Sequence, residues 1–252
     1  MVRHLYNFKH NLERLSESFY WPALDIVLWG LTSRYFQINN QKTNNLVLVV
    51  LSGLVFWQIV WRSQYEITVN LLEELWSHNL VNLFATPLTV NEWLLAVLSL
   101  GIMNMLLGLV FAILLTWVLY TINVLVLGWW ILPFLISLLM TGWWAGLMVA
   151  GLIIRYGHHI QALAWTGVAL LAPFSAIYYP VSSLPTWAQK VSHCIPSSYV
   201  FEAMREFLTN QQILLPQLGI SFVLNLIYLC LSIVFFKYCF RKSQQLGLSR
   251  LE

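Results

Sequence analysis

Six long apolar stretches alternate with short polar segments along the chain. They cover residues 21–36, 46–62, 93–120, 129–154, 160–179 and 213–237. A membrane-crossing helix needs about 20 mostly apolar residues, and fewer suffice where polar flanks reach the interface. The pattern therefore predicts six transmembrane helices, of which the third and fourth are long enough to tilt or to extend past the bilayer.

The composition supports this interpretation. The 252 residues are 59% hydrophobic and only 9% charged, whereas soluble domains carry about 25% charged residues on average. Such a chain lacks the charged surface that a water-soluble protein needs. We therefore expect an all-α integral membrane protein, with residues 1–252 forming a single transmembrane domain.

Residues 1–20 precede the first apolar stretch and have a helical pattern of their own. Apolar side chains recur every three or four positions, at Leu5, Phe8, Leu12, Leu15 and Phe19. Charged side chains fall mainly between them, at Arg3, Lys9, Glu13, Arg14 and Glu17. This predicts an amphipathic helix along the inner membrane surface, which serves as an anchor or also contacts a cytoplasmic partner.

Pro22 and Asp25 favour a new helix start after that segment. Proline suits the first turn of a helix, and a carboxylate there meets the positive end of the helix dipole. An acid inside a membrane helix can instead mark an ion path. The position of Asp25 close to the interface favours the capping role.

Lysine and arginine are unevenly distributed between the two sides of the predicted bundle. With a cytoplasmic N-terminus, nine lie at the inner ends, namely Arg3, Lys9, Arg14, Arg62, Arg155, Lys237, Arg241, Lys242 and Arg250. Four lie at the outer ends, namely Arg34, Lys42, Lys190 and Arg205. Because positive charge accumulates on the cytoplasmic side, both termini are predicted to be cytoplasmic and residues 172–206 to lie outside.

The polar segment 63–92 between the second and third stretches is acidic and partly helical in pattern. Leu72, Trp76, Leu80 and Leu83 recur at helical spacing, and Pro87 ends the pattern. We expect the second span to continue into the cytoplasm, turn through a short helix and return as the third span. An apolar stripe that faces no membrane suits the groove of a partner protein, or it packs against the chain's own helices.

The common motifs of catalysis and cofactor binding are missing. The sequence has no GxxxxGK[ST], GxGxxG, HExxH or GxSxG segment. Its three cysteines, Cys194, Cys230 and Cys239, are scattered, and the adjacent His158 and His159 do not share a helix face. We therefore predict no catalytic, metal or cofactor site in this chain. Apart from Asp25, the six stretches hold no Asp or Glu, which argues against a proton-driven pump.

The segment APFSAIYYPVSSLPTWAQKVSHCIPSSYVFEAMRE, residues 172–206, is too broken for a span and too apolar for a free loop. It is similar to the signature after the fifth span in membrane permeases of type-2 ABC exporters. That signature joins a small-residue and aromatic turn, an LP.W helix and a P..Y..E..R pattern. The matching residues are Tyr178, Pro180, Leu184, Pro185, Trp187, Pro196, Tyr199, Glu202 and Arg205.

The resemblance implies two short re-entrant helices over 180–208 that form an outer gate, and Pro185 and Pro196 agree with two helix starts there. It also implies a permease of the bacterial inner membrane that pairs with a second, identical or unequal, permease. A separate ATPase would bind ATP and Mg²⁺ and dock on the 63–92 coupling region, through Leu75, Trp76, Asn79, Leu83, Phe84 and Pro87. The family's substrates suggest a lipid-linked saccharide, a lipid or a drug-like amphiphile.

Two other functions remain open from the sequence. A secondary transporter or channel that needs no ATPase predicts intramembrane charges or inverted repeats, and neither is evident. An intramembrane enzyme predicts a base beside a nucleophile such as Ser137 or Thr141, and the sequence places none there.

Overall fold

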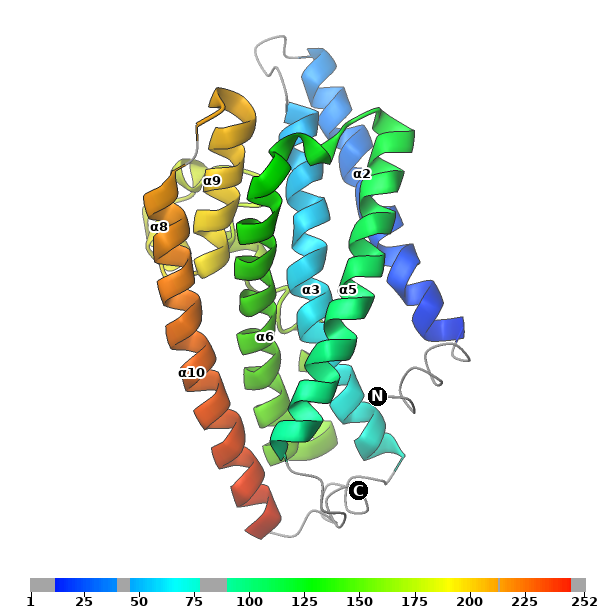
Figure 1. Ribbon diagram of the computed structural model, residues 1–252, viewed down its shortest axis with the longest axis vertical. Helices are drawn as coiled ribbons and strands as arrows, with labels where there is room; N and C mark the ends of the chain where they lie inside the picture. Colours follow the sequence, from blue (N-terminus) through cyan, green and yellow to red (C-terminus); the bar gives the residue numbers. More distant parts are fainter. Residues whose placement is uncertain (1–11, 40–45, 78–89, 213, 246–252) are drawn as a thin grey trace.

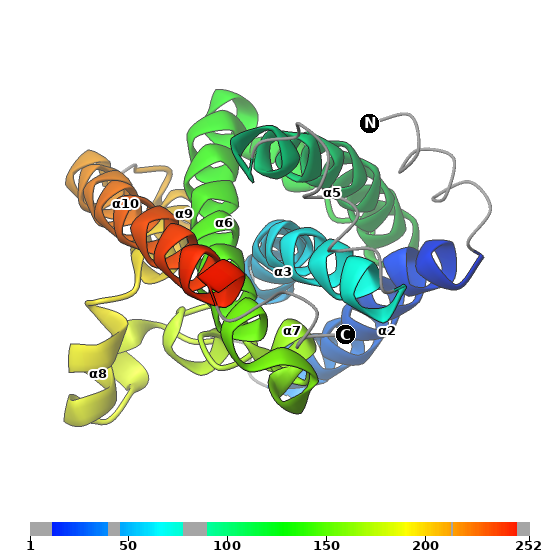
Figure 2. The same ribbon diagram turned by 90° about the horizontal axis from the view of Figure 1, so that it is seen from below.

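The computed structural model describes residues 12–39, 46–77, 90–212 and 214–245. Within these ranges every regular element is a helix (Figure 1). Five helices are long: α2 (Leu12–Asn39), α3 (Leu46–Trp76), α5 (Val90–Tyr120), α6 (Ile131–Tyr156) and α10 (Leu215–Gln245). Helix α3 packs against α2, α5 and α6, and α10 packs along α6 (Figure 2).

Four segments are long and apolar enough to cross a membrane. They are Val47–Trp76, Glu92–Tyr120, Val124–Tyr156 and Leu215–Gln245, and they overlap the second, third, fourth and sixth predicted spans. The third of these segments joins the short 3₁₀ helix η1 (Val124–Trp130) to α6. The prediction of an all-helical multi-pass membrane protein is therefore confirmed, whereas a total of six spans remains a prediction.

Helix α2 does not start where the sequence predicted. It runs without a break from Leu12 to Asn39 with Pro22 in its interior, so a separate helix ending at residue 20 is wrong, and so is a helix start at Pro22. A proline inside a helix removes one backbone hydrogen bond, and tertiary packing can compensate for it. Here the Phe19 ring packs on Phe111 of α5 at 4.8 Å between centroids, and the Tyr120 hydroxyl donates to the Val27 carbonyl at 3.0 Å. Residues 1–11 lie outside the described ranges.

The fifth predicted span, 160–179, is not one continuous helix. It contains part of η2 (Gly157–Ile160), then α7 (Leu163–Thr166) and η3 (Ala172–Phe174), joined by turns. The N–H of Leu170 bonds back four residues to Thr166, but that of Leu171 bonds back only three, to Val168. After α7 the chain therefore passes from turns into the tighter 3₁₀ helix η3, which contains Pro173, a residue without an N–H to donate.

This segment nevertheless lies along α3. The amide of Gln64 donates to the Ala164 carbonyl at 2.9 Å, and the Ile177 carbonyl lies against Gly53, where a Cβ would come within 2.9 Å of it. Eleven residues of α3 separate these two contacts, about 16 Å along the helix axis. A contact nearer the start of the segment, from the Trp76 indole to Gln161 at 3.3 Å, extends its path beside α3 to 23 residues, about 35 Å. The segment therefore runs along most of α3, although it is not one continuous helix.

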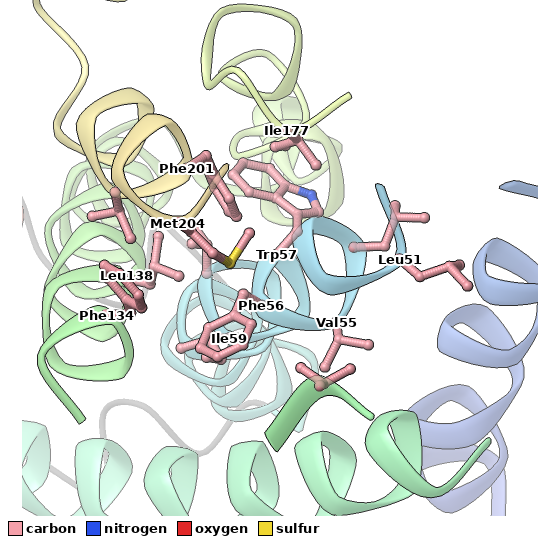
Figure 3. Packing of buried hydrophobic residues seen from close by; sticks show 14 of the residues in the cluster. Leu51, Val55, Phe56, Trp57, Ile59, Phe134, Leu138, Ile177, Phe201 and Met204 are labelled. Atoms are coloured by element: carbon pink, nitrogen blue, oxygen red, sulfur yellow. The ribbon is translucent and has the colours of Figure 1, made fainter. Parts of the chain in front are cut away.

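The main core surrounds the first half of α3 (Figure 3). Phe56 of α3 packs edge-on against Phe134 of α6, with ring centroids 6.5 Å apart, and both rings are fully buried. Trp57 packs on Phe201 of α9 (Pro196–Asn210), with centroids 6.3 Å apart. The segment around α9 is thereby attached to the bundle by the same core that joins the long helices.

Candidate functional site

Residues 172–210, here called the cap, lie at one end of the bundle (Figure 1). The cap holds η3, η4 (Val181–Ser183), α8 (Thr186–Ser192) and α9. Pro196 is the first residue of α9, as the sequence predicted, and α8 starts one residue after Pro185, which takes the N-cap position instead of lying in the first turn. The two short helices are thus present, whereas their re-entry into a membrane stays a prediction.

Helix α9 is strongly two-sided. Val200, Phe201, Met204 and Leu208 are buried and Phe207 is partly buried, whereas Thr209 and Asn210 at the end of the helix are exposed. Its first residue lies beside α10, because the Ser221 hydroxyl donates to the Pro196 carbonyl at 2.8 Å. Ser221 is six residues into α10, so α9 begins about 9 Å below the start of that helix.

Glu202 and Arg205 of α9 form hydrogen bonds with the irregular segment 176–181. The guanidinium of Arg205 donates to Glu202 at 2.9 Å and to the Ala176 carbonyl at 2.7 Å. The same Glu202 oxygen accepts the N–H of Val181 at 2.8 Å. Burial lowers the pKa of Arg205, and the neighbouring Glu202 carboxylate opposes that shift. Ala176 has a left-handed φ of 58°, which is costly without glycine, and the arginine fork holds its carbonyl in place.

Serines satisfy further backbone groups of the cap. Ser192 donates to the Phe174 carbonyl at 2.6 Å, and Ser197 donates to the Ser175 hydroxyl at 2.8 Å. Ser198 donates to the Ser192 carbonyl at 2.7 Å. These four serines are fully or almost fully buried. The run of small hydroxyl residues beside prolines in the sequence was a signal for these bonds that the prediction left unused.

The aromatic residues of the signature do not converge on one point. Tyr178 stacks on Trp29 of α2 at 4.5 Å between ring centroids. Tyr199 donates from its hydroxyl to the His193 carbonyl at 2.9 Å, between α8 and α9. Trp187 is 62% exposed and touches Phe174 edge-on. Of the predicted gate residues, Glu202, Arg205 and the Pro180 turn come together, while Tyr178 faces α2 and Pro185 and Trp187 lie at the surface.

A polar cluster connects α6 to α10 beneath the cap, and we call it the α6–α10 cluster. It consists of Ser137, Thr141, Trp144, Ser221 and Asn225. The Asn225 amide donates to the Ser137 carbonyl at 2.9 Å and accepts from Thr141 at 2.9 Å and from Trp144 at 3.1 Å. Each polar atom of Asn225 therefore has a partner.

A second cluster lies between α3 and α5 and contains Glu66, Asn70 and Asn104; we call it the α3–α5 cluster. The two amide nitrogens donate to the Glu66 carboxylate, from Asn104 at 2.8 Å and from Asn70 at 3.1 Å. Glu66 is 2% exposed. The sequence placed Glu66 in an acidic segment into which the second span continues, and α3 does run unbroken through it to Trp76. The burial of the carboxylate against α5 was not predicted.

The predicted ATPase-docking residues are only partly described. Leu75 is fully buried in a second core cluster with Leu72, Trp93 and Phe236, so at this position the chain packs on its own helices. Trp76 is 45% exposed and stacks on Trp165 at 6.1 Å between centroids. Asn79, Leu83, Phe84 and Pro87 lie outside the described residues.

The turn after α6 lies beside the end of α3, which the sequence did not reveal. The Trp76 indole donates to Gln161 at 3.3 Å, and Tyr156 and His159 in the same turn are exposed. This end of the bundle lies opposite the cap (Figure 1). Among the described side chains, no group of three His, Cys, Asp or Glu residues is placed to hold a metal ion.

A family model described as "ABC-2 type transporter" matches residues 8–209. The match includes the whole of α2, α3, α5 and α6 and almost all of the cap. A comparison with curated proteins found no match to this chain.

Proposed function

This chain belongs to the ABC-2 type transporter family, and we propose that it forms a translocation path as a dimer, driven by a separate ATPase subunit. Its place in the family and its apolar helices make it a transmembrane transport subunit, a permease. The dimer, the ATPase and the direction of transport, which is export, belong to the proposal.

The observation that carries the proposal is the hydrogen-bonded cap. Irregular backbone at membrane depth is tolerated only where protein or a water-filled cavity satisfies its polar groups. In the cap, Arg205 and Ser192 provide donors for the carbonyls of Ala176 and Phe174, and Glu202 accepts the N–H of Val181. A segment satisfied in this way can sit between spans as the re-entrant outer gate that we propose for residues 180–208.

The opposite end of the bundle is the proposed docking side for the ATPase, which would bind ATP and Mg²⁺. Trp76 exposes its ring at the end of α3, and the turn carrying Gln161 supports it from the side. Leu75 anchors this end from within the core. Residues Asn79, Leu83, Phe84 and Pro87 follow directly and complete the proposed coupling helix of the 63–92 region.

Charge supports a cytoplasmic docking side. Arg155, Lys237, Arg241 and Lys242 lie toward the ends of α6 and α10 at that side, whereas Lys190 and Arg205 lie in the cap. By the positive-inside tendency, both termini are cytoplasmic in the bacterial inner membrane.

A specific observation favours a second function. Glu66 is a buried carboxylate inside the apolar segment Val47–Trp76, and an acid at such a position is typical of secondary transporters and channels. This alternative acts without an ATPase. For either function we propose a lipid-linked saccharide, a lipid or a drug-like amphiphile as cargo.

Proteoliposomes distinguish the two functions. The chain is reconstituted alone or with the ATPase encoded beside it, and ATP hydrolysis and movement of a fluorescent lipid are measured. We expect lipid movement only with both proteins and ATP, and loss of stimulated hydrolysis on Leu83→Asp or Phe84→Asp. Gln212→Asp, an exposed change beside the cap, is the matched control and keeps stimulation. Lipid movement by the chain alone under an ion gradient would overturn the exporter in favour of the alternative.

The gate is tested separately by Arg205→Lys and Arg205→Gln. Lysine cannot reproduce the fork that reaches both Glu202 and Ala176, so we expect both variants to lose transport while keeping stimulated hydrolysis. Arg241→Gln, an exposed change at the far end of α10, is the control. Normal transport by both Arg205 variants would mean that the contacts of Arg205 with Glu202 and Ala176 have no role in gating.

A further inference from the structure

The α3–α5 cluster is incomplete. Glu66 is 2% exposed, Asn70 1% and Asn104 4%, so all three side chains are cut off from water. Both amides turn a nitrogen toward the carboxylate. Their oxygens, Oδ1 of Asn70 and Oδ1 of Asn104, are buried and have no hydrogen-bond donor among the residues that the structure describes. Unpartnered buried polar atoms are rare, and an unseen water or ion is a common explanation.

The hydrogen bonds of the cluster also leave its negative charge unneutralised. Among the described residues, the Glu66 carboxylate accepts side-chain hydrogen bonds from two neutral amides. Arg62, one turn earlier on α3, places its guanidinium over the Tyr65 ring at 5.4 Å. A buried carboxylate without a positive partner carries a large desolvation cost.

We propose that Glu66, Asn70 and Asn104 form a binding site for a monovalent cation such as Na⁺ or K⁺. A carboxylate and two amide oxygens are the hard oxygen ligands that such ions take. One cation neutralises one carboxylate, whereas a divalent ion would leave a net positive charge buried. An asparagine amide can also turn about its last bond and exchange its oxygen and nitrogen, because the two ends have nearly the same shape.

Helices α3 and α5 approach each other closely at the cluster, and a cavity farther along their contact offers an approach for an ion. Gly101 of α5 faces Glu66, and a Cβ on that glycine would lie 3.4 Å from the Glu66 Cβ. A cavity of about 50 Å³ lies farther along the same helix contact, and its lining includes Arg62, Tyr65 and Gly108. A volume of this size admits water, so an ion can approach in partly hydrated form.

The site lies between the proposed docking side and the cap. Glu66 is ten residues from the last residue of α3, about 15 Å along the helix axis. A cation there would link α3 to α5 and change the stability of their contact. The inference is independent of the proposed function, because it concerns an equilibrium of the purified chain.

The test is the thermal unfolding of the purified protein in detergent at fixed pH and ionic strength. N-methyl-glucamine chloride is replaced stepwise by sodium or potassium chloride. We expect the unfolding midpoint to rise by several degrees and to saturate with at least one of the two ions. Glu66→Gln abolishes the rise, while Glu206→Gln, the same chemical change in the cap, keeps it.

Two results of this unfolding experiment would contradict the proposal. An equal rise in wild type and Glu66→Gln would be a general salt effect. A pH-dependent midpoint that Glu66→Gln removes, with no response to sodium or potassium, would make a proton the occupant. If Glu66→Gln does not fold, equilibrium binding of radioactive sodium and potassium to wild type and Asn104→Leu replaces it, and at least tenfold weaker binding by the variant is expected. Equal binding, or none to either protein, would refute the site.

Discussion

The α6–α10 and α3–α5 clusters are both polar, buried and placed between long helices, yet they differ in completeness. Asn225 in the first uses its nitrogen and its oxygen in hydrogen bonds, with Ser137, Thr141 and Trp144 as partners. Asn70 and Asn104 in the second leave both side-chain oxygens without donors beside a carboxylate. A neutral network in which every polar atom is hydrogen-bonded is typical of a structural contact between helices, here called a joint. A charged network with unpartnered polar atoms is typical of a binding site.

The largest expected effect is that of Asn225→Asp. The change removes the donor to Ser137 and adds a charge where every neighbour is already engaged. We expect a loss of about 3 kcal/mol in the free energy of unfolding, the cost of an aspartate at the centre of a membrane helix. Reversible unfolding in mixed detergent measures it. A loss as small as that of Thr141→Val would mean that the cluster is not a joint.

Asn104→Leu should have the next largest effect. It removes one of the two donors to the buried Glu66 carboxylate and keeps a similar volume. We expect a loss of about 1–2 kcal/mol in cation-free buffer, typical of a buried group left with one hydrogen bond fewer. The same unfolding assay measures it, with Asn210→Leu, the same change at an exposed position of α9, as the matched control. No change would show that the carboxylate is satisfied elsewhere.

Thr141→Val tests a single bond of the complete cluster. Valine keeps the branched shape and removes only the hydroxyl that donates to Asn225. Hydrogen bonds between membrane helices average about 0.6 kcal/mol, and we expect a loss near that value. Thr32→Val is the matched control, because the Thr32 hydroxyl bonds only within α2. A loss well above the average would indicate cooperation within the network.

Glu66→Gln should have the smallest effect on stability in cation-free buffer. The amide keeps the shape of the side chain and removes a buried charge that has no recorded positive partner. We expect a change of less than about 0.5 kcal/mol in the free energy of unfolding, since neutral replacement of a buried charge is often tolerated. A large loss would place a fixed positive partner at Glu66 and remove the distinction between the clusters.

Part of the candidate site was predictable from local pattern. Pro185 and Pro196 marked the starts of α8 and α9, and the apolar stretches marked the long helices. Such features depend on neighbours in sequence, through the fixed φ of proline and the period of a helix. The partners of Arg205 were not predictable, because Ala176 lies 29 residues away and its left-handed backbone follows no glycine signal.

The sequence by itself determined that this chain is a bundle of apolar helices with a broken, proline-rich segment before its last helix. Those properties follow from residue type and local period, which act within a few turns of chain. Only the tertiary structure decided that α2 runs on through Pro22, that residues 160–179 do not form a single helix, and that Glu66 is buried. Each of these depends on contacts between distant segments, whose packing and hydrogen bonds outweigh the local preference.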